Sequence, residues 1–325
     1  MRRREVIGGL LAGAALTRSF PALAQKTARI ALLGGGTAQS SEIFVEALRQ
    51  GLHENGLAES RDYDLDLRWA EGDYTRFPEL VADVLQRNPS VMMANTIAAI
   101  RAAQRATTAV PIVMLHINDP VGNGLVASLA RPGGNTTGLS NLNEDLTPKF
   151  IDIITAILPR PRSIAAVFNP TNPSNRILFE SARTQAASIG VTVRPAELPN
   201  AGALGSLFET LAQNPPDALL VLADVTLLDQ RDAIAALGLR YGLPVISGYP
   251  EMTHAGALAG YGPPRREFYR RAATYVKKIL DGTRPQDLPV EQPARIELSV
   301  NLKTARSLGI TIPEFVLARA DEVIE

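Results

Sequence analysis

The sequence repeats itself at long range, and this repeat limits the possible folds more than any other feature. Residues 29–33 correspond to residues 163–167, an offset of 134 positions, and Gly56 corresponds to Gly190 at the same offset. Each copy is much longer than the roughly 20 to 50 residues of a solenoid unit. We therefore interpret the repeat as a domain duplication, which predicts two similar halves.

Within each half, short apolar runs alternate with amphipathic stretches, which is typical of an α/β domain with a parallel sheet. The expected strands are residues 28–33, 64–69, 91–94 and 112–115 in the first half, and 163–168, 192–197, 218–222 and 245–247 in the second. The expected helices are residues 42–55, 76–86, 97–107, 175–189, 204–213 and 228–241. A chain of 325 residues is long enough for two such lobes.

Composition argues against several classes of function. The chain has no cysteine, which removes disulfides, thiolate metal sites and cysteine nucleophiles. Its three histidines, His53, His116 and His254, are too far apart for a helical metal-ligand pair. We interpret His116, which follows a buried strand, as a wall residue with its hydrogen bonds satisfied rather than as a base. Equal numbers of basic and acidic residues, 33 each, argue against a nucleic-acid partner. No catalytic, metal-binding or cofactor motif is recognisable, so we expect no catalytic residue, no metal and no cofactor.

The first 24 residues have the pattern of an export signal. Three arginines, Arg2 to Arg4, precede an apolar segment that reaches Leu16, and Ala22-Leu23-Ala24 resembles a cleavage site. The apolar segment is too short to cross a bilayer, which needs about 20 residues. We expect a cleaved signal and a periplasmic mature chain that does not insert into the membrane. The Arg3-Arg4 order is compatible with the twin-arginine route, and the choice between that route and the general one stays open.

In an open parallel sheet, ligands bind beyond the carboxyl ends of the strands, so the residues after each expected strand are candidates for a site. Gly34-Gly35-Gly36-Thr37 follows the first strand and either turns the chain or exposes a helix N-terminus to an anion. It matches neither the dinucleotide motif nor the P-loop. In the second half, the loop 169–175 takes the equivalent place, and its asparagines either cap a helix or bind a polar ligand.

Polar residues also follow the third and fourth expected strands of each half. Asp224 suits a ligand ammonium, because charge-assisted hydrogen bonds are strong, although helix capping is the simpler explanation for this residue taken singly. Tyr249 and Tyr261 suit stacking on a flat ligand. The candidate ligand-binding residues are Thr37, Asn95, Thr96, Asp119, Asn169, Asn172, Asp224, Thr226, Tyr249, Glu251 and Tyr261.

Several longer motifs carry a resemblance to a known family. They are Arg68-Trp69-Ala70-Glu71-Gly72, Asp119-Pro120-Val121-Gly122, Leu129-Ala130-Arg131-Pro132-Gly133-Gly134-Asn135, Thr137-Gly138-Leu139-Ser140-Asn141, Val290-Glu291-Gln292-Pro293, Asn301-Leu302-Lys303-Thr304-Ala305 and Ala320-Asp321-Glu322-Val323-Ile324. With these motifs the sequence resembles the ABC-transporter substrate-binding proteins of the tryptophan/tyrosine-binding type, which have the type I periplasmic binding protein fold. The resemblance runs from about residue 28 to the C-terminus.

The resemblance implies two flavodoxin-like α/β lobes, with parallel sheets flanked by helices, a hinge that the chain crosses several times and a ligand cleft between the lobes. It implies that lobe 1 comprises residues 28–140 plus about 262–290, and lobe 2 residues 141–261 plus about 291–325. Asp224 and Thr226 match the family's Asp-Asn-Thr strand-end motif, whereas Val225 replaces its polar middle residue. The ligand therefore stays unidentified, and an aromatic amino acid is not assumed.

By this resemblance we expect the periplasmic solute-binding component of an ABC importer. It would be a monomer that binds a small polar molecule, such as an amino acid, and delivers it to an inner-membrane permease and through it to an ATPase. Two alternatives stay open, an exported hydrolase-like α/β enzyme that uses the same cleft and a periplasmic ligand sensor. A DNA-binding repressor of this fold is disfavoured, because an export signal stands where a helix-turn-helix would be.

Overall fold

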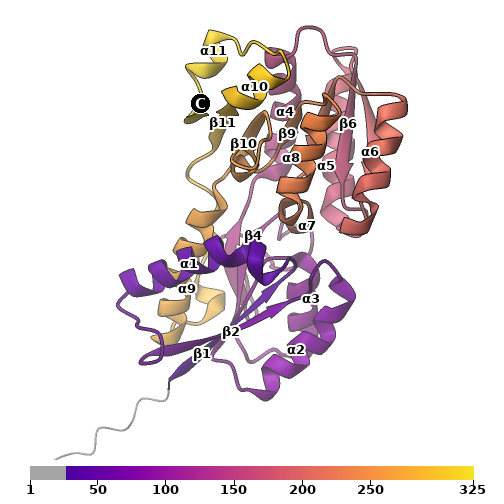
Figure 1. Ribbon diagram of the computed structural model, residues 1–325. Helices are drawn as coiled ribbons and strands as arrows, with labels where there is room; N and C mark the ends of the chain where they lie inside the picture. The colour runs from indigo at the N-terminus through magenta and orange to yellow at the C-terminus, as the bar shows by residue number, and fades with distance from the viewer. Residues whose placement is uncertain (1–26) are drawn as a thin grey trace, which may run out of the picture.

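The computed structural model describes residues 27–325, which form two α/β lobes, one above the other in Figure 1. Each lobe has a sheet flanked by helices, which confirms the expected fold class. The expected export signal lies outside the described residues. No helix within residues 27–325 is both long enough and apolar enough to span a membrane.

The first lobe contains a five-stranded parallel sheet in the order β2-β1-β3-β4-β5. Its strands are β1 (Ala28–Gly34), β2 (Tyr63–Trp69), β3 (Val91–Ala94), β4 (Ile112–Ile117) and β5 (Thr136–Ser140). Helices α1 (Ala38–Glu54), α2 (Phe77–Gln86) and α3 (Ile97–Ala106) follow β1, β2 and β3. Successive side chains of β1 enter different cores, because strand side chains alternate between the two faces of a sheet. Ile30 packs in the core on the α1 side, and Ala31 packs in the core on the α2 and α3 side.

The second lobe contains a seven-stranded sheet in the order β12-β11-β10-β9-β8-β6-β7, in which only the β10–β11 pair is antiparallel. Its strands are β6 (Ser163–Phe168), β7 (Thr192–Glu197), β8 (Ala218–Val221), β9 (Val245–Ser247), β10 (Ala259–Gly262), β11 (Glu297–Asn301) and β12 (Glu322–Ile324). Its helices are α4 (Asn143–Ile157), α5 (Pro173–Ala187), α6 (Leu204–Gln213), α7 (Val225–Asp229), α8 (Arg231–Arg240), α10 (Leu302–Ser307) and α11 (Glu314–Leu317).

The structure corrects one expected helix and adds several elements. The single helix expected over 228–241 is wrong, because α7 ends at Asp229 and α8 begins at Arg231, with Gln230 outside helical geometry between them. Strands β5, β10, β11 and β12 and helix α4 were not expected. The sequence of β5, Thr-Thr-Gly-Leu-Ser, looks like a polar turn, although all five of its residues are buried.

Helix α9 (Arg265–Leu280) follows β10 of the upper sheet but packs along α1 in the lower lobe (Figure 1). The two helices approach closely at Gly51, where an added Cβ would lie 2.3 Å from the carbonyl oxygen of Arg270. After the 3-10 turn η4 (Pro285–Asp287), Glu291 pairs with Leu139 before the chain returns to β11. The chain thus passes between the lobes three times, after β5, after β10 and after η4.

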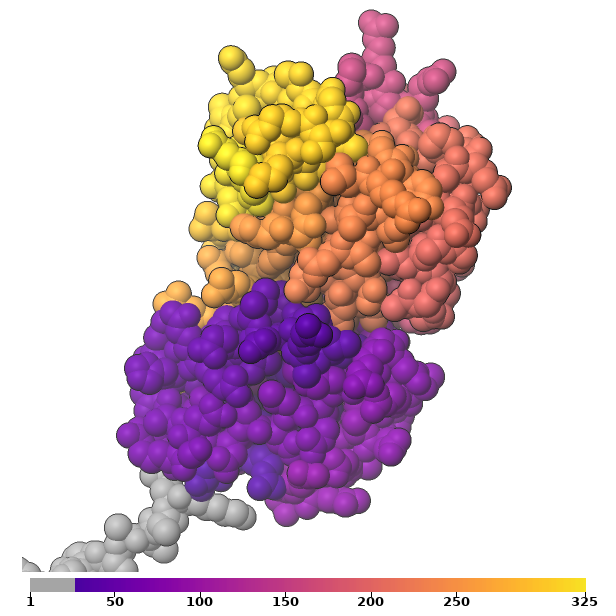
Figure 2. Space-filling view, viewed as in Figure 1, coloured from indigo at the N-terminus to yellow at the C-terminus, as the bar shows by residue number. Residues whose placement is uncertain are grey.

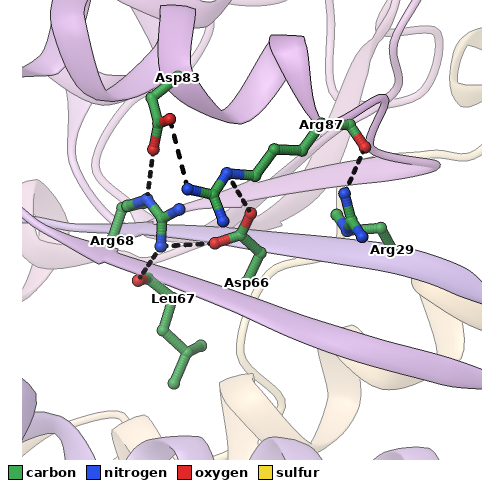
Figure 3. Close-up of polar contacts among 6 residues, drawn as sticks. All are labelled: Arg29, Asp66, Leu67, Arg68, Asp83 and Arg87. Carbon is green, nitrogen blue, oxygen red and sulfur yellow. Dashed lines mark hydrogen bonds and ion pairs between the residues drawn. The ribbon is translucent and has the colours of Figure 1, made fainter. Parts of the chain in front are cut away.

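A network of ion pairs fastens β2 to α2 on the first lobe (Figure 3). The guanidinium of Arg68 lies 2.6 Å from Asp66 Oδ1 and 2.9 Å from Asp83 Oδ2. Arg87 lies 3.8 Å from the second Asp66 oxygen and 3.5 Å from Asp83. Because Asp66 is only 8% exposed, its charge needs these partners. Arg68, the first residue of the Arg68–Gly72 motif, therefore has a structural role in joining β2 to α2.

Candidate functional site

A cavity of about 60 Å³ lies between the two lobes, near the carboxyl ends of their parallel strands. The first lobe contributes residues that follow β3 and β4, and the second contributes the N-terminal turns of α5 and α7. The lobes touch beside it: Figure 2 shows indigo atoms of the first lobe directly against orange atoms of the second. This is the place where open α/β sheets bind ligands.

The wall from the first lobe is built at the end of β3. Asn95 accepts a hydrogen bond from Gly35 N–H (2.9 Å) and donates one to the Tyr269 hydroxyl (2.9 Å), so its side chain is held between β1 and α9. Thr96 caps α3 by accepting from Ala99 N–H at 3.1 Å. The first N–H groups of a helix have no partner inside it, and Ile97 and Ala98 of this turn line the cavity. The first lobe therefore offers backbone donors at a positive helix end.

The wall from the second lobe is organised around Asp224, which is 2% exposed. Its carboxylate caps α7 by accepting from Thr226 N–H at 2.9 Å and from the Thr226 hydroxyl. It also accepts from Asn169 Nδ2 (3.4 Å) and from Asn172 Nδ2 (2.8 Å). Helix capping and a position in the cavity wall are thus combined in one residue. Among residues 27–325, Asp224 is the only acidic or basic side chain other than His116 in this wall.

Four buried polar atoms in the cavity wall have no protein partner. They are Tyr74 Oη, His116 Nε2, Asn143 Oδ1 and Ser174 Oγ. Buried polar groups without hydrogen bonds are rare, because each one loses its hydration without compensation. Their concentration in one cavity makes this cavity the candidate ligand-binding site.

Both cavity tyrosines are neutral donors at ordinary pH. Burial raises the pKa of Tyr74 well above its usual value, and the nearby Asp224 carboxylate adds to the effect. Burial also raises the pKa of Tyr249, against the opposing effect of the Arg265 guanidinium. These hydroxyls can therefore bind an acceptor without adding charge to the site.

The lobes are held together beside the cavity by Asp229, the last residue of α7. Its carboxylate accepts from Thr37 N–H at 2.8 Å and from Ser40 Oγ at 2.5 Å, both in the first lobe. Burial raises the pKa of Asp229, while the hydrogen bonds from Ser40 and Thr37 lower it. The glycine loop permits this contact, since a Cβ on Gly36 would lie 2.1 Å from Asp229 Oδ2.

A second buried polar group lies where α9 enters the first lobe. Arg265 is 2% exposed, and its guanidinium carbon lies 4.8 Å from the Phe44 ring centroid and 5.4 Å from that of Tyr249. Its backbone N–H donates to Glu251 Oε1 at 2.8 Å. Burial raises the pKa of Glu251, with the Arg265 charge opposing the rise. Arg265 and Glu251 therefore lie at the hinge, and neither lines the cavity.

The structure brings some of the predicted site residues together and separates others. The cavity wall contains Asn95, Thr96, Asn172, Asp224 and Tyr249, while Asn169 and Thr226 lie behind it, bonded to Asp224.

The other four predicted residues lie elsewhere. Thr37 belongs to the contact between the lobes, and Glu251 lies beside Arg265. Asp119 lines a separate hollow of about 200 Å³ near the hinge. Tyr261 faces a hollow of about 370 Å³ on the second lobe and packs edge-on against Phe150.

Sequence reasoning missed three of the four residues with unpartnered atoms in the cavity. Asn143 comes just after β5, so recognising that strand would have made it a strand-end candidate. Tyr74 lies in a 3-10 turn after β2, and Ser174 lies in the first turn of α5, where it passes for a capping residue. The fourth residue, His116, was expected to be a wall residue with its hydrogen bonds satisfied. It does lie in the cavity wall, but its Nε2 has no partner, so that part of the prediction was wrong.

Comparisons with known proteins agree with this architecture. The family model of ABC transporter substrate binding proteins matches residues 37–324. The tyrosine-binding protein of Clostridioides difficile (strain R20291) is 23% identical over 262 residues, which cover 80% of this chain and 75% of that protein.

Two solved structures have similar folds over 92% of this chain and 100% of their own. A conserved domain protein from Vibrio cholerae has a TM-score of 0.85 at 29% identity. An ABC domain from Streptococcus pneumonia, in complex with L-Trp, has a TM-score of 0.83 at 25% identity. With the family match extending over nearly all of the described residues, this chain belongs to the ABC transporter substrate-binding proteins.

Proposed function

We propose that this protein binds a free amino acid, or a closely related zwitterion, in the cavity between its lobes. The observation that carries the proposal is the cavity wall itself. It combines one buried carboxylate, the first turns of α3, α5 and α7, and four buried polar atoms that lack partners.

Each end of a zwitterion has a matching group in this wall. Asp224 suits the ammonium, because its carboxylate is buried and already oriented by Asn172 and Thr226. The first turn of α3, at Ile97 and Ala98, suits the carboxylate, because a helix N-terminus binds anions through free N–H groups. The two groups belong to different lobes, so one ligand can bridge them and favour the arrangement in which the lobes meet.

The remaining walls favour an apolar or aromatic ligand side chain. Ile117, Leu178 and Val225 supply apolar surface, and the rings of Tyr74 and Tyr249 are available for stacking. The names of the relatives support this choice, since one is a tyrosine-binding protein and one contains L-Trp. Val225, which breaks the polar strand-end motif, thus contributes packing in this proposal.

Access from outside is proposed to lie past Tyr74. A second hollow, of about 360 Å³, shares Tyr74, Ile97, Ala98, Thr171 and Pro173 with the cavity. Separation of the lobes would join the two spaces and admit the ligand, and closure would trap it.

We further propose that the protein works outside the inner membrane, after removal of residues 1–24, and acts without catalysis. As a monomer it would present its ligand to an inner-membrane permease that an ATPase drives. This part of the proposal rests on family membership and on the export-signal pattern of the N-terminus.

The test uses residues 25–325 in a thermal-shift screen of amino acids, purines, sugars, carboxylates and oligopeptides. A ligand at 100 times its Kd should add about 2.7 kcal/mol to the free energy of unfolding. We expect a shift with an aromatic or apolar amino acid, confirmed by calorimetry, and recovery of that ligand unchanged. Chemical conversion of the ligand would favour the hydrolase alternative, and a shift with sugars or purines alone would refute the zwitterion site.

A further inference from the structure

His116 occupies an unusual position in the cavity wall. The pairing between β4 and β5 shifts register between Met114 and Ile117, and within this irregularity His116 has a φ of 56°. Such left-handed backbone is uncommon for residues other than glycine, and a bulge in a strand re-aims a side chain. The His116 side chain belongs to the cavity wall and is 6% exposed.

The amide of Asn141 determines which ring nitrogen of His116 carries the proton. Asn141 Nδ2 donates to the His116 carbonyl oxygen at 3.0 Å, and Asn141 Oδ1 accepts from Asn143 N–H at 3.2 Å. These two bonds fix the amide in one orientation, since a flipped amide would oppose oxygen to oxygen. The same Nδ2 lies 3.2 Å from His116 Nδ1, which must therefore accept. A neutral imidazole that accepts at Nδ1 carries its proton on Nε2.

We propose that His116 is a specificity-determining residue whose Nε2–H donates a hydrogen bond to an acceptor group of the ligand, its carboxylate in the case of an amino acid. This inference rests on the proposed function, because it names the group that recognises one end of the zwitterion. The Nε2 atom is buried and has no protein partner. A ligand without an acceptor at that point would leave the N–H unpaired, which the site would disfavour.

The surroundings keep this imidazole neutral. Burial and the positive charge of Arg265 lower the pKa of His116 to about 3. The rings of Phe268 and Tyr249 pack against it, with centroids 4.6 and 6.0 Å away, and the other ionisable groups in the cavity wall are Tyr74 and Asp224. His116 therefore acts as a neutral hydrogen-bond donor whose proton stays on Nε2. It adds no positive charge beside the N-terminus of α3.

The tautomer can be read without any ligand by long-range ¹H–¹⁵N NMR of the imidazole rings. The chain has only three histidines, so the spectrum of His116→Gln assigns the signal. We expect the neutral Nε2–H pattern for His116 from pH 5 to 8. An imidazolium pattern at pH 6, or the Nδ1–H tautomer, would overturn the inference.

Contact with the ligand is tested with L-tryptophan and L-tyrosine as probes. On binding, the Nε2–H resonance of His116 should move while that of Nδ1 stays, and an unmoved Nε2–H would overturn the contact. By calorimetry, His116→Asn, which tolerates left-handed backbone but is too short to reach the ligand, should raise the Kd about 10- to 100-fold. His116→Gln, which keeps a donor, should recover part of that loss.

His254→Gln is the matched control, because His254 is 60% exposed, is paired with Glu322 and does not line the cavity. It should leave both the Kd and the His116 signals unchanged. If the wild-type protein binds neither probe, the proposed amino-acid ligand fails for these two compounds. In the ligand-free protein, the Nε2–H tautomer would then support the donor role of His116, and the Nδ1–H tautomer would overturn it.

Discussion

The contact between Asp229 and the first lobe should set how readily the lobes close. Asp229→Ala removes the two hydrogen bonds, from Thr37 N–H and Ser40 Oγ, that join α7 to the start of α1. A hydrogen bond to a charged group contributes about 1.5–3 kcal/mol, but desolvation of the carboxylate offsets part of it, as its raised pKa indicates. We expect a net loss of about 2 kcal/mol in closure, which is roughly a 30-fold change in the closing equilibrium.

A glycine variant tests the same contact from the opposite side. Gly36→Ala would place a Cβ 2.1 Å from Asp229 Oδ2, so the carboxylate must move and lose its partners. Gly205→Ala is the matched control, since Gly205 in α6 has no atom within 4 Å of an added Cβ. The assay is calorimetric Kd for the amino acid identified by screening, with small-angle scattering to follow the opening of the lobes.

The two changes should not be additive. Asp229→Ala and Gly36→Ala should each raise the Kd up to about 30-fold, because only the closed population binds tightly. In the Asp229→Ala background, Gly36→Ala should add little, since the clashing carboxylate is gone. Equal losses from Gly36→Ala in both backgrounds, or an unchanged Kd for Asp229→Ala, would refute the reasoning.

Three further outcomes are expected. Asp224→Asn should raise the Kd for the amino acid at least about 30-fold in calorimetry, because Asp224 is buried in the cavity wall. Asp152→Asn, at an exposed position, should leave the Kd unchanged, and equal Kd values for the two variants would show that Asp224 does not bind the ligand. Gly51→Ala should lower the free energy of unfolding in urea by about 1–3 kcal/mol, because its Cβ would meet the Arg270 carbonyl, and a wild-type value would contradict the close α1–α9 packing. The unfolded chain binds a proton on His116 near pH 6.5 and the folded chain only near pH 3, so the His116 contribution to stability falls as pH drops below 6.5, by about 2 kcal/mol at pH 5. His116→Gln should flatten that slope in urea titrations, and equal slopes would refute the assignment.

The fold class could be predicted from the sequence because buried strands are recognisable within short stretches of residues. Buried parallel strands such as β3 and β6 are continuous apolar runs, and their expected bounds agree with the structure. Strand β5 has no such signature. Its threonines, glycine and serine are buried by neighbouring segments, among them Leu288 and Glu291 far along the chain. Strand-end reasoning therefore found Asn95 and Asp224 but missed Asn143.

What the sequence by itself determined is the alternation of strands and helices and the polar groups at the strand ends, because each depends on residues close together in the chain. The division into two lobes was predicted from the repeat at an offset of 134 positions. Only the tertiary structure decided which of these groups share a cavity. Thr37 N–H donates to Asp229, 192 positions along the chain, and Tyr261 lines a different hollow, on the second lobe. It also decided that α9 packs on the lobe opposite to the strand before it. Such contacts depend on how the three hinge crossings orient two rigid sheets, and no local pattern of residues encodes that orientation.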